Sequence, residues 1–195
     1  MTVQAFLFGK APAHGDFVSR GLASDVEAVW DAWASREVTR AAEDLGAAFS
    51  SAHDAVPPIR FVTGPGDLGP EWRAGAVAAS IDATGRRFIL AAGLDGLSPA
   101  RASALGVVVA GRTEILLYAI LADRVTADDA IEALAGMLAD PAELAAADSL
   151  GAATEVAGLW WAAEDATDPV ALASPPPGLF AALLDRTARA LETAE

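Results

Sequence analysis

Short apolar runs separated by turn-forming residues are the main pattern along this chain. Runs of this kind, bounded by glycine, proline or charged residues, are typical of strands. They predict strands at residues 3–8, 59–63, 72–81, 87–92 and 154–162.

The clearest helix is expected from Ser24 to Phe49, where apolar residues recur at roughly helical spacing. Ser24 and Glu27 have the spacing of a capping box, in which the serine oxygen accepts a backbone N–H and the glutamate reaches back. Trp30 and Trp33 lie three positions apart on the apolar face, which favours packing in the core.

The second half of the chain is less clearly patterned. Residues 99–121 combine runs of strand-forming residues with a length that favours a helix, and both interpretations stay open. A further helix start is expected at Thr126, leading to Leu138. Residues 141–147 add another turn of helix, and residues 178–195 close the chain as a helix.

The adjacent Trp160 and Trp161 bear on how the layers are arranged, because neighbouring strand residues point to opposite faces of a sheet. Either helices cover both faces, or one tryptophan is exposed at a binding surface. We favour the covered sheet. With no repeat and no long linker, we expect a single α/β domain over residues 1–195, a three-layer α/β/α sandwich with a mixed, partly antiparallel sheet.

The charge balance restricts the partners. The chain has 27 acidic and 13 basic residues, a formal net charge of −14, and no basic stripe. Nucleic-acid binding requires basic residues that neutralise phosphates, so it is not expected. The acidity fits a soluble protein, or docking onto a basic patch of a partner.

Metal, cofactor and membrane sites are not expected either. The chain has no cysteine, and its histidines, His14 and His53, lie far apart in the sequence, so no zinc or calcium pattern occurs. The most apolar stretch, residues 105–122, is interrupted by Arg112 and Glu114. We expect a cytoplasmic protein without membrane insertion.

Residues 9–17 read Gly-Lys-Ala-Pro-Ala-His-Gly-Asp-Phe and contain three groups with chemical potential, Lys10, His14 and Asp16. One hypothesis is a small hydrolase or nucleotide-handling enzyme in which they carry protons or contact an anion. His14 is the natural acid or base, because imidazole titrates near neutral pH. The segment is not a P-loop, since its Gly-Lys pair opens the motif instead of ending it.

The other interpretation of the same segment is a shaped turn, and we favour it. Gly9 ends the first strand and Pro12 keeps the backbone extended. Gly15 allows a positive φ, Asp16 accepts nearby N–H groups and Phe17 fills the core.

Residues 80–88 predict a hairpin. Asp82 and Gly85 stand at the first and fourth positions of a type I turn. With a positive φ at Gly85, the loop comprises residues 83–85 and carries a G1 bulge. Asp82 and Arg86 then face each other, in an opposite-charge contact that contributes about 0.2–1 kcal/mol.

Taken in order, these segments resemble the TagF family, also called ImpM. The resemblance runs from residue 6 to about residue 90, and the second half matches more loosely. Its landmarks are residues 8–22, Trp30-Asp31-Ala32-Trp33, Ile59-Arg60-Phe61, Trp72 with Gly75, and Ser80-Ile81-Asp82 with Gly85-Arg86 and Phe88. Ile59 and Ile89 depart from the family pattern, which has an aromatic residue and a proline there.

The resemblance implies a three-layer α/β/α fold and a post-translational repressor of type VI secretion. It further implies a link to a kinase, a phosphatase and a forkhead-associated scaffold, with the scaffold as direct partner. We expect no catalytic residue and no cofactor. A third hypothesis is a structural subunit of the secretion apparatus.

The residues singled out by these patterns fall into two sets. The candidate partner contacts are Lys10, His14, Asp16, Arg20, Asp82 and Arg86. The residues expected to shape the structure are Gly9, Pro12, Gly15, Phe17, Trp30, Trp33, Ser80 and Gly85.

Overall fold

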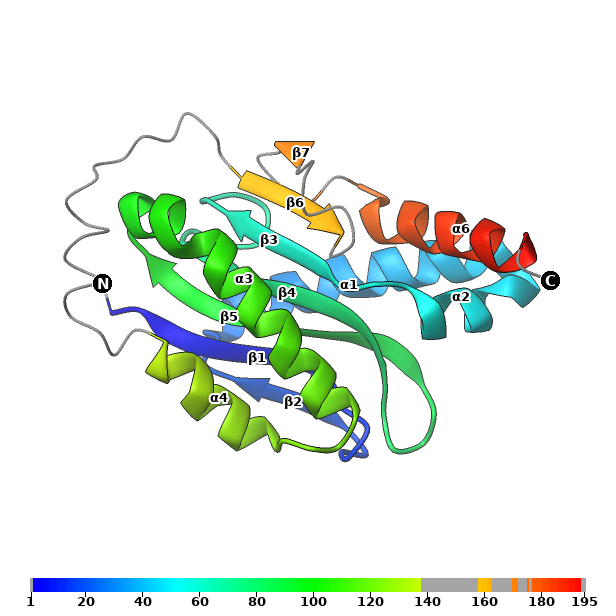
Figure 1. The fold of residues 1–195 in the computed structure, drawn as a ribbon, viewed down its shortest axis with the longest axis horizontal. Coiled ribbons are helices and arrows are strands. Elements are labelled where there is room, and N and C mark those ends of the chain that lie inside the picture. Colours follow the sequence, from blue (N-terminus) through cyan, green and yellow to red (C-terminus); the bar gives the residue numbers. More distant parts are fainter. Residues whose placement is uncertain (1, 138–157, 163–169, 172–174, 176, 194–195) are drawn as a thin grey trace.

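A seven-stranded sheet forms the centre of the computed structural model, which describes residues 2–137, 158–162, 170–171, 175 and 177–193 (Figure 1). The strand order is β2-β1-β5-β4-β3-β6-β7. The strands are β1 (Gln4–Lys10), β2 (Phe17–Arg20), β3 (Ile59–Thr63), β4 (Trp72–Ile81), β5 (Arg87–Leu97), β6 (Gly158–Ala162) and β7 (Val170–Ala171).

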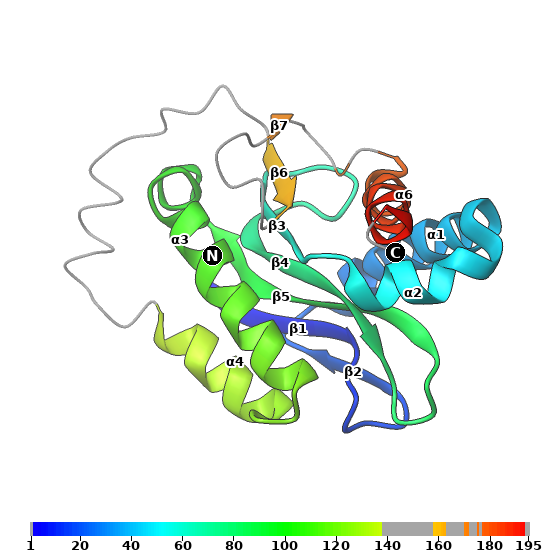
Figure 2. The same cartoon turned by 45° about the vertical axis from the view of Figure 1, so that its right-hand side comes forward.

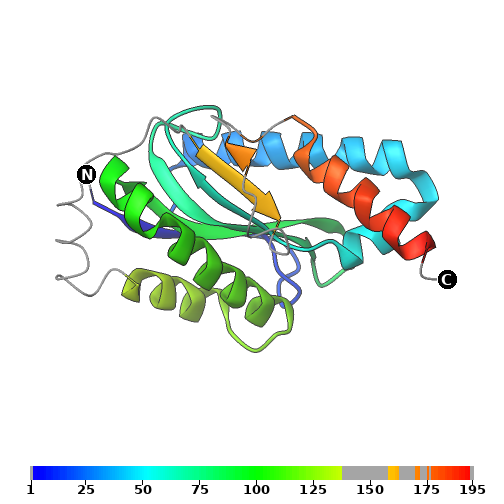
Figure 3. The same cartoon turned by 45° about the horizontal axis from the view of Figure 1, so that its top comes forward.

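Helices cover both faces of this sheet, which gives three layers (Figure 2). One face carries α1 (Ser24–Leu45), α2 (Phe49–Ala55) and α6 (Leu179–Glu192), and the 3₁₀ turn η1 (Gly46–Ala48) joins α1 to α2. Figure 3 shows α1 and α6 side by side on this face. The opposite face carries α3 (Pro99–Leu121) and α4 (Ala127–Gly136). The expected α/β/α arrangement is confirmed.

Strand alternation divides the core into two clusters. Phe6 packs toward α1 while its neighbour Leu7 packs toward α3 and α4, and both are fully buried. Trp160 and Trp161 divide in the same way, with Trp160 stacked on Phe61 at 4.9 Å between ring centroids. Both tryptophans are buried, so the interpretation of a sheet covered on both faces is confirmed.

Every strand pairing that the structure describes is antiparallel, whereas the sequence suggests a mixed sheet. The local pattern identifies strands but does not fix the direction in which they pair. At one edge it also misses a strand, because β2 turns back along β1 where the sequence shows only a shaped turn. Four residues with one buried side chain give no alternation long enough to identify a strand.

Residues 99–121 form one continuous helix, which decides between the two interpretations of this stretch. Ser98 is its N-cap and accepts a hydrogen bond from the Arg101 N–H, and Pro99 follows in the first turn. By length and composition α3 is the one described helix that qualifies as a membrane span. It packs on β3, β4 and β5, as a core helix of a layered protein does.

The helix starts are partly as expected. Thr126 and Asp129 form a capping box at the start of α4. The capping box predicted at Ser24 is wrong, because Ala23 is the N-cap of α1 and makes no side-chain bond. The Glu27 carboxylate accepts a hydrogen bond from Ser19 Oγ at 2.7 Å instead. The helix expected at residues 141–147 lies outside the described residues.

The neighbouring strand β5 leaves no room for a side chain at Gly9. Its φ is +129°, and a Cβ added there would lie 2.1 Å from the Ile89 carbonyl oxygen. Gly15 has no atom within 4 Å of an added Cβ and makes a matched control.

We expect Gly9→Ala to lower the free energy of unfolding by about 2–4 kcal/mol, because strain and a backbone clash combine. Gly15→Ala should stay within about 0.5 kcal/mol of wild type in chemical denaturation; equal stability of the two variants would contradict this role of Gly9.

Candidate functional site

The predicted hairpin forms between β4 and β5. The Gly85 N–H donates to the Asp82 carbonyl at 2.9 Å, and the Asp82 N–H donates to the Arg86 carbonyl at 3.1 Å. Gly85 has a φ of +82°. These features define a three-residue loop with a G1 bulge, so the turn prediction is confirmed.

The Asp82 carboxylate is buried and collects five hydrogen bonds. Its Oδ1 accepts the Thr84 N–H at 2.9 Å, the Thr84 hydroxyl at 2.7 Å and the Arg86 N–H at 3.0 Å. Its Oδ2 accepts Arg86 Nε at 2.6 Å and Lys10 Nζ at 3.0 Å. The contact with Arg86 is the one that the sequence predicts, whereas the contact with Lys10 is not predicted.

This environment keeps Asp82 ionised. Burial raises the pKa of the carboxyl, but the donors from Thr84, Lys10 and Arg86 outweigh burial and hold its pKa well below the ordinary value. Lys10 is buried as well, 7% exposed, so its ammonium lies inside the ion pair rather than at the surface.

Further hydrogen bonds join the first loop to the hairpin. The Ala83 N–H donates to the His14 carbonyl at 2.9 Å, and Arg86 Nη2 donates to the Gly15 carbonyl at 2.9 Å. Ser80 Oγ donates to the Lys10 carbonyl at 2.6 Å. We call residues 10–16 and 80–86, with these bonds, the latch.

Two shaping residues of the first loop behave differently from expectation. Gly15 does not have a positive φ; Gly9 and Gly21 do, at the two ends of the β1–β2 segment. Phe17 does not fill the core, since it is 44% exposed. Its ring lies 5.0 Å from the Phe88 ring, at the border of the core next to β2. Trp30 and Trp33 are buried as expected.

Asp16 and Arg20 protect the edge strand β2. The Phe17 N–H donates to Asp16 Oδ1 at 2.8 Å, and Arg20 Nη1 donates to the Ser19 carbonyl at 2.9 Å. Backbone groups at a free sheet edge otherwise pair with another chain. Arg20 Nε also forms an exposed ion pair with Asp128 of α4 at 3.0 Å.

Exposure to solvent divides the candidate contact residues into three groups. Lys10 and Asp82 are buried and hold the backbone. His14 is half-buried. The exposed members are Asp16, Arg20 and Arg86.

The second histidine contacts the backbone of β5. His53 is buried, its Nε2 lies 2.8 Å from the Phe88 carbonyl, and burial lowers its pKa. It lines a hollow of about 350 Å³ that Ser80 also lines. The Ser80 hydroxyl donates to the Lys10 carbonyl and the imidazole Nε2 contacts the Phe88 carbonyl, so each group is engaged by a backbone carbonyl, whereas a serine nucleophile is bonded to its base. In the described residues no group of three His, Cys, Asp or Glu side chains is placed to hold a metal ion.

Sequence reasoning missed the groups that act across long separations. Lys10 and Asp82 are 72 positions apart. Glu37 on α1 accepts the N–H groups of Gly178 and Phe180 at 2.8 and 3.1 Å, and so caps α6 from 141 and 143 positions away. Neither pairing leaves a local signal, because the two partners lie in segments that are far apart in the sequence.

Asp82 makes the stability of the protein depend on pH. A pKa that folding depresses adds stability above the unfolded value, about 3.9, and this stability is lost as the pH falls through the folded value. We expect Asp82→Asn to be less stable than wild type in urea denaturation at pH 7, and the difference to shrink steadily below about pH 4. Asp31→Asn, an exposed control on α1, should match wild type at pH 7. A difference for Asp82→Asn that persists unchanged at pH 2.5 would refute this role of the charge.

Comparisons with known proteins agree with this architecture. The model of the TagF N-terminal domain, described as type VI secretion system-associated, matches residues 7–137. Among solved structures, the crystal structure of PA0076 from Pseudomonas aeruginosa PAO1 is similar with a TM-score of 0.71 and 27% sequence identity, over 92% of this chain and 93% of that chain. The search of curated proteins gave no match. Because the family model spans more than half of the chain and both segments of the latch, the protein belongs to the TagF family of type VI secretion system-associated proteins.

Proposed function

We propose that the protein is a cytoplasmic repressor that acts after translation by binding a component of the type VI secretion machinery. The direct partner in this proposal is a forkhead-associated scaffold, and the kinase and phosphatase of the same signalling arm are linked to it functionally. Family membership supports the association with type VI secretion. The binding mode and the partner are the proposal.

The latch is the observation that carries this proposal. Its buried ion pair and three cross-bonds fix a surface loop that would otherwise sample many conformations. A loop ordered before binding loses less conformational entropy when a partner docks. Asp16 and Arg86 are exposed side chains of the latch, and Arg20 is an exposed side chain of the edge strand β2 that follows it.

The geometry favours binding over the hydrolase or nucleotide-handling alternative. Lys10 would have to supply a free ammonium to an anion, but it pairs with Asp82 in the interior. Asp16 is exposed and bonds to the backbone of the next residue. A proton carrier works within hydrogen-bond reach of the reacting group, and the hollow of about 350 Å³ beside this loop is lined by none of Lys10, His14 and Asp16.

The binding proposal is tested by capture of the forkhead-associated scaffold with the purified protein. We expect the double variant Asp16→Ala, Arg20→Ala to bind it at least about tenfold more weakly, equivalent to about 1.4 kcal/mol. The control is Asp185→Ala, Arg189→Ala, which likewise removes one acidic and one basic exposed side chain, here from α6. Size-exclusion chromatography checks that opening the β2 edge has not caused self-association. Retained binding by the double variant would exclude the first loop as the contact surface, and no capture by wild type would exclude the scaffold.

The enzyme alternative has its own test. If His14 were an acid or base, His14→Ala would lower the rate by about 100-fold or more. We expect a screen of ester, phosphoester and nucleotide substrates to show no turnover that depends on His14. A His14-dependent rate on any of these substrates would overturn the binding proposal as the main activity.

A further inference from the structure

A groove lies between β2 and the first two turns of α1, on the side of β2 away from α4. It has a volume of about 420 Å³ and is lined by Phe8, Phe17, Ser24, Glu27, Ala28 and Asp31. Phe8, Phe17 and Asp31 lie in segments that resemble the TagF family, but the sequence does not predict a groove there, because Phe17 reads as a core residue. The exposure of Phe17 is what opens this surface.

An ordered aromatic ring forms one wall of the groove. Phe17 contacts the rings of Phe8 at 6.0 Å and Phe88 at 5.0 Å, so its position is set by neighbours that are themselves buried. Lys10 Nζ lies 5.4 Å from its centroid, but that ammonium is neutralised by Asp82. A fixed and partly exposed aromatic ring is a typical anchor at protein interfaces.

Carboxylates form the opposite wall. Glu27 is half-buried and accepts the Ser19 hydroxyl, while Asp31 is exposed one turn further along α1. Within the described part of the chain, neither carboxylate takes part in an ion pair. The helix dipole explains acidic residues in the first turn of α1, but it does not explain Asp31 in the second turn.

The nearby cations are already committed. Lys10 and Arg86 both bond to Asp82, and Arg20 pairs with Asp128 on the other side of β2. Two backbone groups of β2 are occupied by the side chains of Asp16 and Arg20. The groove therefore offers an aromatic face and uncompensated negative charge, and strand addition at β2 is opposed.

We propose that this groove binds an arginine or lysine side chain on a basic segment of a partner protein. The apolar stem of the side chain lies against Phe17, and its charged end lies between Glu27 and Asp31. Long basic side chains combine these two properties, and cations are attracted to aromatic faces. The inference rests on the proposed function for the identity of the partner. The chemistry of the bound side chain is inferred from the groove alone.

The test uses a fluorescein-labelled peptide, Gly-Ser-Arg-Val-Arg-Ser-Gly, titrated with the full-length protein and followed by anisotropy. The same peptide with glutamate in place of arginine is the control. We expect the arginine peptide to bind, with an affinity that falls as salt rises, and the glutamate peptide not to bind. Equal binding of the two peptides would overturn the inference.

Charge reversal on α1 localises the site. Asp31→Lys should weaken binding of the arginine peptide by about tenfold or more, whereas Glu43→Lys, an exposed control on the same helix, should change it by less than about twofold. Phe17→Ala should also weaken binding, with circular dichroism confirming that it folds. Equal effects of Asp31→Lys and Glu43→Lys would show that the peptide is attracted only by the overall charge of the protein. That result would refute binding in the groove.

The outcome is separable from that of the proposed function. If wild type and Asp31→Lys capture the forkhead-associated scaffold equally, the groove is not the contact and the repressor proposal stands. If the peptide binds in an Asp31-dependent manner but the scaffold is not captured, the groove stands and the scaffold proposal fails.

Discussion

Burial of the Asp82 carboxylate is the constraint on which the candidate site depends. A carboxylate removed from water is unfavourable unless donors replace its hydration. Three donors come from the turn that follows it, a fourth from Arg86 Nε, and the fifth from Lys10 on β1. Since the last donor belongs to a distant strand, satisfying one turn residue also fixes where the first loop lies.

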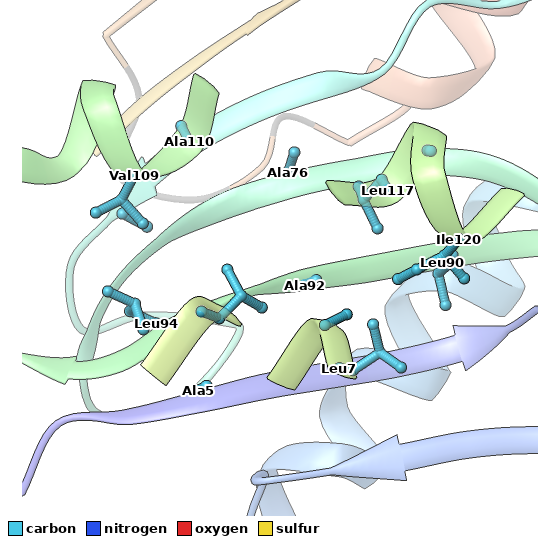
Figure 4. Close-up of a cluster of buried hydrophobic side chains, with 14 of the residues drawn as sticks. Ala5, Leu7, Ala76, Leu90, Ala92, Leu94, Val109, Ala110, Leu117 and Ile120 are labelled. Atoms are coloured by element: carbon cyan, nitrogen blue, oxygen red, sulfur yellow. The ribbon is translucent and has the colours of Figure 1, made fainter. Parts of the chain in front are cut away.

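Small residues allow α3 to pack closely on the sheet. The centres of β4 and β5 present alanines toward α3, and Figure 4 shows Ala76 and Ala92 on the strands between the positions of Val109 and Leu117 on the helix. Gly106 lets α3 approach β3, because a Cβ there would lie 2.6 Å from Val62. The high alanine content therefore allows helix and sheet to pack closely, in addition to favouring helices.

The sequence predicts best what short stretches decide by themselves. The strands at residues 59–63 and 72–81, the hairpin turn at Asp82 and the division of Trp160 and Trp161 between two faces all follow from local pattern. Each depends on side-chain alternation or on turn geometry, which a few neighbouring residues specify.

What the sequence does not predict depends on partners far along the chain. Glu27 has the right spacing for a capping box, but Ser19 competes for its carboxylate through the tertiary structure. Phe17 is apolar and reads as a core residue, yet the core beside β2 is already filled by Phe8 and Phe88. Lys10 looks like a reactive amine until the fold brings Asp82 to it.

Buried ion pairs in this protein act more as positioning devices than as a source of stability. The Coulomb attraction of a buried pair is largely offset by the loss of hydration, so the pair as a whole adds little stability, although removing one partner leaves a buried charge and is costly. Lys10 with Asp82 places the first loop, and the fully buried Arg73 with Asp95 joins β4 to β5 at the opposite end of the sheet.

Positioning by buried charge also has a consequence at the surface. Because Lys10 and Arg86 are both engaged by Asp82, and Arg20 by Asp128, no cation of the described residues pairs with Glu27 or Asp31 in the groove, and a basic side chain of a partner would supply the missing charge.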